Sequence, residues 1–156
     1  MTITINEVTN ENVNAILKLG INTKQKSFIE TTEHCLEEAM ECKYYKPVGL
    51  YSDNSLVGFA MYGFFPEEGK NGRVWLDRFL IDARYQGLGL GSIMLKALIQ
   101  RLTKEYNCNE IYLSIVEDNQ AALHLYKKFN FTFNGELDIN KEKIMVKKYN
   151  TSEWYK

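Results

Sequence analysis

Three glycines alternate with two leucines in the segment Gly87-Leu88-Gly89-Leu90-Gly91. The segment follows a mostly apolar stretch, 73–81, that predicts a strand, and it opens a stretch, 89–106, with the apolar spacing of an amphipathic helix. Glycine has no Cβ, so backbone N–H groups can approach a ligand here, and the first N–H groups of a helix lack intrahelical acceptors. The pattern predicts either a phosphate-binding loop or a plain turn between strand and helix.

Two common phosphate-binding motifs fit this loop poorly. A Walker A loop ends in Gly-Lys-Ser/Thr, whereas Gly91 is followed directly by Ser92. Gly87, Gly89 and Ser92 approach the dinucleotide fingerprint, but that motif opens the first βαβ unit and is followed, about twenty residues later, by an acidic residue. Here the loop lies in mid-chain, and residues 106–109 predict a turn.

Two other motifs match better. Residues 84–91 resemble the acetyl-CoA signature of the GNAT acetyltransferases, Q/R-x-x-G-x-G/A, with Gln86, Gly89 and Gly91 in its fixed positions. A second GNAT motif, N-x-x-A-x-x-L-Y-x-x-x-G-F, is matched further along the chain by Asn119, Ala122, Leu125, Tyr126 and Phe131. Asn130 replaces the usual glycine, and asparagine also tolerates a positive φ. Because both motifs occur in the family's order, the chain is identified as a member of the GNAT family.

The resemblance implies acetyl-CoA as the cofactor and assigns residues to it. In GNAT members the end of the strand before the glycine loop separates from its neighbour, and its exposed backbone pairs with the pantetheine amides. The residues so assigned are Phe79, Leu80, Ile81, Gln86, Gly87, Leu88, Gly89, Leu90, Gly91, Ser92, Asn119 and Tyr126.

The resemblance also implies a catalytic role for Tyr126, whose phenol would protonate the departing thiolate of coenzyme A. The alternative is that its ring packs the helix against the sheet and its hydroxyl only holds the thioester. Asn119 suits a cofactor contact, a helix N-cap, or both, and Asp118 is a second candidate for the cap. His124 is available as a base, although a lone histidine on a helix is more often structural or solvated.

Asp77 and Arg78 are charged residues in an otherwise apolar strand, where burying either one without a partner is costly. Either they pair with groups across the sheet, or Asp77 faces the acceptor and acts catalytically. An alkylammonium, with a pKa of about 10.4, must lose a proton before it attacks a thioester, and a carboxylate can relay that proton. The cysteines form no Cys-His pattern that would favour an acyl-enzyme, so direct attack is expected, and no metal site is predicted.

Within the GNAT family, the chain resembles the small bacterial polyamine (spermine/spermidine) N-acetyltransferases over most of its length. The matching segments include Gln25-x-x-Phe28-Ile29, Val57-Gly58-Phe59-Ala60-Met61-Tyr62, Trp75-x-x-Arg78-Phe79-Leu80-Ile81-Asp82 and Gly135-Glu136. The implied activity is transfer of acetyl from acetyl-CoA to a primary amine, most simply a polyamine, by direct attack on the thioester.

An acidic stripe of Glu33, Glu37 and Glu41 recurs every four residues on a predicted helix. Like charges at this spacing repel one another, so the stripe is either a plain solvated face or a surface that attracts a polycation. We assign the three glutamates to acceptor binding, together with Trp75, which shares a strand face with Asp77.

The elements that must position these residues predict an α+β fold with a mixed sheet, mostly antiparallel with one parallel strand pair, flanked by helices as in GNAT proteins. Strands are expected at 2–8, 48–51, 56–65, 73–81, 110–116, 132–137 and 141–148. Helices are expected after a cap at Thr9 or Asn10, at 32–44, at 89–106, and from Asp118 or Asn119 to Asn130. On the second helix, either Cys35, Ala39 and Cys42 or Leu36 and Met40 face inward.

Length and composition limit the number of domains and the classes of function. At 156 residues the chain is expected to form a single domain, 1–156, and its net charge of −1 gives no support to nucleic-acid or membrane binding. No signal-peptide pattern opens the sequence, and Cys35 and Cys42 are too far apart along a helix for a disulfide, which favours the cytoplasm. The sequence is compatible with a homodimer without requiring one.

Three functions fit these observations. The first is an acetyl-CoA:polyamine N-acetyltransferase. The second is a GNAT enzyme for another amine, such as a protein N-terminus, a lysine, an amino acid or an aminoglycoside. The third is a catalytically weak acyl-CoA-binding module. Thiol release with a panel of acceptors separates the three.

Overall fold

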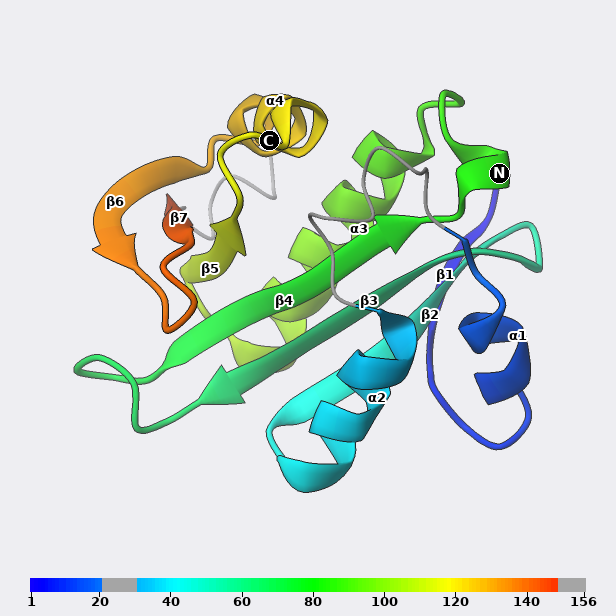
Figure 1. Cartoon of the computed structure of the whole chain (residues 1–156), viewed down its shortest axis with the longest axis horizontal. Coiled ribbons are helices and arrows are strands. Elements are labelled where there is room, and N and C mark those ends of the chain that lie inside the picture. The colour runs from blue at the N-terminus through cyan, green and yellow to red at the C-terminus, as the bar shows by residue number, and fades with distance from the viewer. Residues whose placement is uncertain (21–30, 149–156) are drawn as a thin grey trace. The chain divides into compact units, whose positions relative to one another are not determined.

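The computed structural model describes residues 1–20 and 31–148. Figure 1 shows strands and helices that follow one another as β1 (Ile3–Glu7), α1 (Val13–Leu17), α2 (Thr32–Glu41), β2 (Tyr45–Ser52), β3 (Ser55–Phe65), β4 (Arg73–Ile81), the short 3-10 helix η2 (Ala83–Tyr85), α3 (Leu90–Tyr106), β5 (Glu110–Ile115), α4 (Gln120–Lys128), β6 (Thr132–Leu137) and β7 (Lys143–Lys148). The predicted segment Gln25-x-x-Phe28-Ile29 and the tail beyond Lys148 lie outside the described residues.

The strands hydrogen-bond in the order β1-β2-β3-β4-β5-β7-β6. β4 and β5 run parallel, with Trp75 opposite Tyr112, whereas the pairs β1–β2, β2–β3, β5–β7 and β6–β7 are antiparallel. A parallel pair needs a crossover, and α3 supplies it. The predicted α+β class with a mixed sheet is therefore confirmed.

The described residues fall into two compact units, one from Met1–Gly63 and Leu76–Leu98, the other from the described parts of Phe64–Trp75 and Ile99–Lys156. β4 and α3 each begin in one unit and end in the other. A single domain over residues 1–156 stays a prediction.

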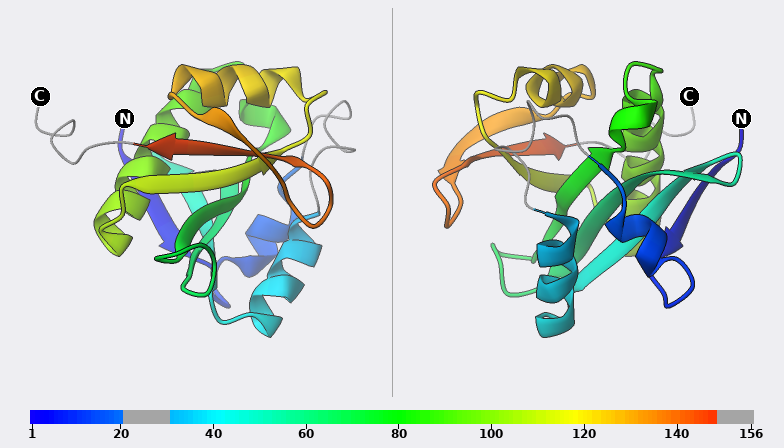
Figure 2. Two further views of the ribbon diagram at one scale, coloured as in Figure 1. Left: turned by 90° about the vertical axis from the view of Figure 1, so that its left-hand side faces the viewer. Right: turned by 45° about the vertical axis from the view of Figure 1, so that its right-hand side comes forward.

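The first unit buries a cluster of Ile16, Cys35, Phe59, Met61 and Leu80. Figures 1 and 2 show α1 and α2 on one face of its strands and the beginning of α3 on the opposite face. α3 fits this position because Leu90, Met94, Leu95 and Leu98 form one buried stripe at helical spacing.

Helix α2 corrects two predictions. It starts at Thr32 as expected, with the Thr31 hydroxyl accepting from His34 N–H, but it ends at Glu41 rather than at residue 44, because Tyr45 already begins β2. Its inward face combines parts of both predicted sets, with Cys35 buried and Leu36 and Ala39 packed on the core, and the inward placement of Met40 was wrong. Met40 is 88% exposed. Four residues advance a helix by about 40° more than a full turn, so Met40 lies past Leu36, toward the side of Glu33 and Glu37.

Two further boundaries differ from expectation. The N-cap of α1 is Asn12, not Thr9 or Asn10, so the helix is limited to Val13–Leu17. The turn after β2 contains only Asp53 and Asn54, both with positive φ, since Ser52 pairs directly with Ser55. Asparagine and aspartate suit this tight hairpin turn because they tolerate left-handed backbone angles.

The second unit is built around β5, which pairs with β7, which in turn pairs with the edge strand β6. Tyr112, Ile144 and Val146 form a buried cluster against which Trp75 packs. Figure 2 shows α4 lying along β7. Within the described residues, no helix has the length and hydropathy of a membrane span.

Gly58 on β3 yields the first testable prediction. A Cβ at this position would lie 2.4 Å from the backbone carbonyl oxygen of Leu80, so only glycine allows this close approach of β3 and β4. We expect Gly58→Ala to lower the free energy of unfolding by about 1–3 kcal/mol, as overpacking does. Urea unfolding measures the loss. Gly20→Ala is the control, because a Cβ at Gly20 meets nothing within 4 Å, and equal stability of the two variants would contradict the prediction.

Candidate functional site

The turn from β4 into the glycine loop is built on a buried carboxylate. Asp82 is 2% exposed and accepts hydrogen bonds from the backbone N–H groups of Arg84 at 2.8 Å and Gly20 at 3.3 Å, and from Arg84 Nε at 3.1 Å. Burial alone raises the pKa of Asp82, but these hydrogen bonds and the positive guanidinium outweigh it and hold the pKa below its usual value. Asp82 is therefore a permanent anion at neutral pH that fixes the start of the loop.

The predicted loop residues lie directly beyond this anchor. The Gln86 side chain turns back to donate to the carbonyl of Ile81 at 2.9 Å, so the residue is tied to the end of β4. Gly87, Leu88 and Gly89 are exposed, Gly91 and Ser92 are half-buried, and Leu90 packs inward. Gly87 and Gly89 both have positive φ, 81° and 80°, and a Cβ on either would meet nothing within 4 Å.

The amides at the beginning of α3 fit an anion. The N–H of Ile93 donates to the carbonyl of Gly89 at 3.4 Å, but among residues 1–20 and 31–148 the N–H groups of Gly89, Leu90 and Gly91 have no acceptor. Unsatisfied donors and the positive end of the helix dipole favour negative charge at this point. Open space beside the two glycines and unbonded amides are what a diphosphate requires.

The strand residues predicted to contact the cofactor precede the loop without a gap. Leu80 and Ile81 are buried and Phe79 is half-buried, and all three lie in β4 beyond the Trp75–Tyr112 pair. Their side chains thus belong largely to the core, which leaves the backbone as the part that can bind a ligand. Backbone pairing with a cofactor stays a prediction.

Asp77 and Arg78 form a charged cluster with α2. The Arg78 guanidinium lies 3.3 Å from Asp77 Oδ2 and 3.7 Å from Glu38 Oε1, and Glu38 Oε1 is also 3.3 Å from His34 Nε2. Burial raises the pKa of the neighbouring Tyr45, and the negative charges of Asp77 and Glu38 raise it further. The cluster holds two partly buried carboxylates around one guanidinium, so the two charged strand residues do pair within the protein.

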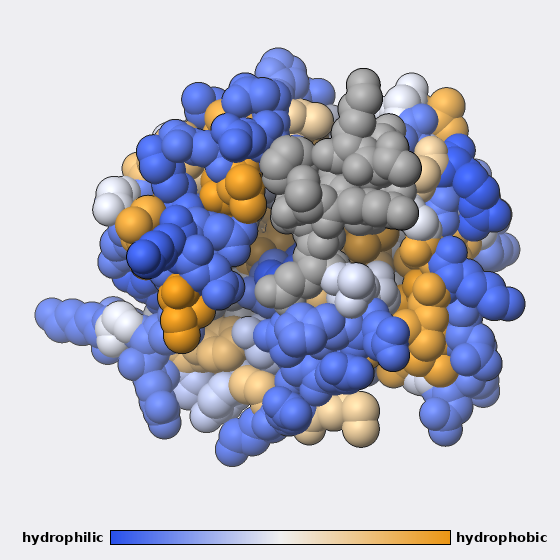
Figure 3. All heavy atoms as spheres, viewed as in Figure 1, coloured by the Kyte–Doolittle hydropathy of each residue, from blue (hydrophilic) through white to orange (hydrophobic). Residues whose placement is uncertain are grey.

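The acidic stripe on α2 lies apart from this cluster. Glu33, Glu37 and Glu41 are all exposed, whereas Glu38 is the glutamate of α2 that turns toward β4. Figure 3 shows the outward surface of α2 as mainly hydrophilic. The structure therefore separates three exposed glutamates from Glu38, which packs inward. From the sequence, Glu38 was only a neighbour of the acidic stripe.

Helix α4 carries Asn119 and Tyr126. Asn119 is buried and is the N-cap, since its Oδ1 accepts from Ala122 N–H at 3.3 Å, and this settles the choice between Asp118 and Asn119. Tyr126 is half-buried, and its ring meets Phe131 edge-on at 5.8 Å. Burial raises the pKa of the Tyr126 phenol to about 12, so it stays protonated at neutral pH.

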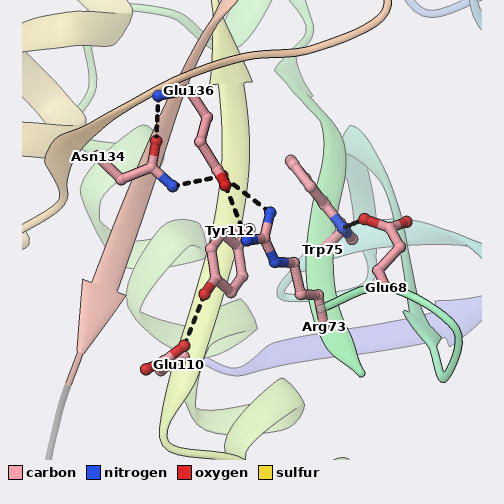
Figure 4. Close-up of polar contacts among 7 residues, drawn as sticks. All are labelled: Glu68, Arg73, Trp75, Glu110, Tyr112, Asn134 and Glu136. Atoms are coloured by element: carbon pink, nitrogen blue, oxygen red, sulfur yellow. Dashed lines mark hydrogen bonds and ion pairs between the residues drawn. The ribbon is translucent and has the colours of Figure 1, made fainter. Parts of the chain in front are cut away.

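Trp75 lies in a network of polar and ring contacts (Figure 4). Its Nε1 donates to Glu68 at 2.9 Å and its ring lies 5.5 Å from that of Tyr112, over which the Arg73 guanidinium is placed at 4.3 Å. Arg73 also makes two hydrogen bonds to Glu136, at 2.9 and 3.1 Å. Trp75 is thus held firmly by its own unit, and its predicted contact with the acceptor stays a prediction.

Comparison with known proteins identifies the family of this chain. Residues 13–131 match the Acetyltransferase (GNAT) family. This chain belongs to that GNAT family. The chain is 62% identical over 150 residues to the spermine/spermidine N(1)-acetyltransferase of Bacillus subtilis strain 168, covering 94% of this chain and 99% of that one. The human spermidine/spermine N(1)-acetyltransferase-like protein 1 is 40% identical over 88 residues, covering 55% of this chain and 12% of the human protein.

Solved GNAT structures share the fold. The aminoglycoside acetyltransferase AAC(6')-Ib in complex with coenzyme A superposes with a TM-score of 0.80 at 17% identity, covering 98% of both chains. The spermidine N-acetyltransferase of Vibrio cholerae, in complex with CoA and spermine, gives 0.70 at 18% identity over 99% of this chain and 98% of that one. The predicted family, its likeness to bacterial polyamine acetyltransferases and the GNAT fold are confirmed, and acetyl-CoA is the cofactor of the family.

Asp82 and Glu38 were missed as site-building residues. The sequence could have indicated the role of Asp82, because an aspartate directly after an apolar strand often accepts a hydrogen bond from the backbone N–H two residues later. Glu38 carried none, since its sequence neighbours Glu33, Glu37 and Glu41 have the same charge and only the packing of α2 on the strands distinguishes it.

Gly89 yields the second prediction. We expect Gly89→Ala to weaken acetyl-CoA binding at least about tenfold in calorimetric titration, because a Cβ opposes the positive φ that presents the helix amides. Gly135→Ala is the matched control, since Gly135 has a similar φ of 87° and equally open surroundings but lies on β6. Equal affinities of the two variants would contradict the role of the loop.

Proposed function

We propose that this chain is an acetyl-CoA-dependent N-acetyltransferase whose acceptor is a polyamine of the spermine and spermidine type. One observation carries the proposal: 62% identity, over nearly the full length of both chains, to a Bacillus subtilis protein named spermine/spermidine N(1)-acetyltransferase. We place the enzyme in the cytoplasm, in keeping with the free thiols of Cys35, Cys42 and Cys108.

The cofactor is held by backbone more than by side chains. The N–H groups of Gly87, Leu88, Gly89, Leu90, Gly91 and Ser92 hold the diphosphate, with Gln86 fixing the loop, and the backbone of Phe79, Leu80 and Ile81 pairs with the pantetheine amides. Asn119 is the further cofactor contact. Acetyl-CoA, when bound, supplies the acetyl group as a thioester.

The acceptor amine is bound and deprotonated by carboxylates. Asp77 is the proposed proton acceptor for the ammonium, directly or through water. Its partner Arg78 lies beside it, and Glu38 adds a second carboxylate to the same cluster. An amine that enters this cluster as a cation meets two carboxylates and one guanidinium, so its charge is balanced before it loses a proton.

The leaving thiolate is protonated by the Tyr126 phenol. A phenol with a pKa of about 12 holds its proton throughout the physiological range, which is one requirement of a general acid. Within the described residues the hydroxyl has no hydrogen-bond partner, so its proton is available to a ligand.

A panel of acceptors tests the proposed function. Free-thiol release is measured with spermine, spermidine, a lysine peptide, an N-terminal peptide and an aminoglycoside, each at several concentrations. We expect spermine and spermidine to have the highest kcat/KM. Preference for another amine would favour a different GNAT activity, and tight acetyl-CoA binding without turnover would favour a binding module.

Tyr126→Phe yields a third prediction. Loss of the acidic hydroxyl should lower kcat for spermidine by about 10²-fold or more, whereas the affinity for acetyl-CoA changes little because the ring is retained. In the native enzyme, kcat should show no decline from Tyr126 ionisation below about pH 11, since the phenol is protonated below its pKa. Tyr51→Phe, which removes a hydroxyl that accepts a hydrogen bond from Asn12, serves as the control. Unchanged turnover in Tyr126→Phe would show that Tyr126 is not the general acid.

The acidic stripe yields a fourth prediction. Replacing Glu33, Glu37 and Glu41 by glutamine should raise KM for spermine and flatten its salt dependence, because exposed charges act on a polycation through screened, long-range attraction. The control triple Glu7→Gln, Glu11→Gln and Glu67→Gln makes the same change in net charge at other exposed positions. If both triples shift KM equally, the stripe is only a solvated face.

A further inference from the structure

Lys147 is a buried lysine that the proposed chemistry does not use. It lies on β7 opposite Ile111 of β5, and it is 7% exposed while Ile111 is fully buried. Lys148, the next residue, is exposed. Burying an ammonium among apolar residues is costly unless it is hydrogen-bonded, so an apolar side chain would be the simpler choice at this position.

The ammonium of Lys147 is directed at the end of α4. Its Nζ donates to the backbone carbonyl of Phe129 at 2.9 Å, and Phe129 is the C-cap of that helix. Carbonyls at a helix C-terminus lack intrahelical donors, and the helix dipole makes this end negative. Figure 2 shows α4 lying along β7, the strand that carries Lys147. Lys147 thus ties the helix end to the sheet by a charge-assisted hydrogen bond.

The tied turn is also the turn that fixes Tyr126. The Tyr126 carbonyl accepts from the N–H groups of Phe129 at 3.1 Å and Phe131 at 3.0 Å. Asn130, between them, has a φ of 69°, which reverses the chain so that buried Phe131 packs against the Tyr126 ring. A displacement of Phe129 therefore moves both the backbone and the ring contact of Tyr126.

We propose that Lys147 is a positioning residue for Tyr126, which it orients through the Phe129–Phe131 turn. The inference rests on the proposed acid role of Tyr126. A misplacement of about 1 Å in a reacting group is enough to cost up to about 10²-fold in rate. Lys147 should therefore affect kcat rather than the binding of acetyl-CoA.

The first test compares three variants. Lys147→Met keeps the length of the side chain and removes the donor, and we expect kcat to fall about tenfold while KM for acetyl-CoA stays within about twofold. Lys147→Arg keeps charge and donors and should recover most of the loss. Lys148→Met, its exposed neighbour on β7, should match the native enzyme. Equal kcat in Lys147→Met and Lys148→Met would overturn the proposal.

The second test separates positioning from a general structural role. In a Tyr126→Phe background, Lys147→Met should cause no further fall in kcat, because it acts through the missing hydroxyl. A fall of the same size in both backgrounds would overturn the proposal.

Amide hydrogen exchange tests the Lys147 anchor without relying on enzyme activity. Lys147→Met should accelerate exchange of the Phe129 and Phe131 amides relative to native protein, and unchanged exchange would overturn the anchor whatever the activity. If Tyr126→Phe retains full turnover, the acid role fails, yet the exchange result still decides whether Lys147 holds the turn. Should Lys147→Met fail to fold, Lys147→Gln, which is too short to reach Phe129, replaces it in all three measurements.

Discussion

The buried carboxylate of Asp82 fixes the place where β4 gives way to the glycine loop, and the proposed cofactor site depends on that constraint. Its oxygens bond Arg84 and Gly20, its own N–H donates to Val57 of β3 at 2.8 Å, and the next residue, Ala83, donates to the carbonyl of Gly20 at 2.8 Å. The glycine loop is exposed at Gly87–Gly89, but these contacts fix the segment from which it starts. Among the described residues, the amides of Gly89, Leu90 and Gly91 have no acceptor, whereas the segment before them is held by these contacts.

The elements around this anchor were the easiest to predict from sequence. β4 has the predicted bounds of residues 73 and 81, and α3 differs by one residue at its start, because a long apolar stripe and well-placed glycines mark both. A cap at Asp118 or Asn119 and the positive φ of Asn130 followed from side-chain chemistry that acts over one helical turn, and the structure selects Asn119. Where the determinant is local, sequence suffices.

Contacts between distant residues account for what could not be predicted. α2 ends early because Tyr45 already belongs to β2, where it pairs with Gly63 of β3. Met40 is exposed because the packing of Cys35 and Leu36 on the core sets the orientation of the helix. The inner position of Glu38 depends on Arg78, forty residues later in the chain, and that of Lys147 on Phe129. No periodicity in either segment distinguishes these residues from their exposed neighbours.

The division of carboxylates on α2 bears on how a polycation could be selected. The chain has a net charge of −1, so it has no strong overall field to attract a cationic acceptor. Attraction must then come from charges clustered within about one Debye length, roughly 8–10 Å, which favours a stripe on a single helix face. Glu33, Glu37 and Glu41 have no guanidinium paired with them in the described residues, whereas Asp77 and Glu38 are balanced by Arg78. In the proposed function, the outer carboxylates raise the local concentration of a polycation and the inner ones hold a single ammonium in place.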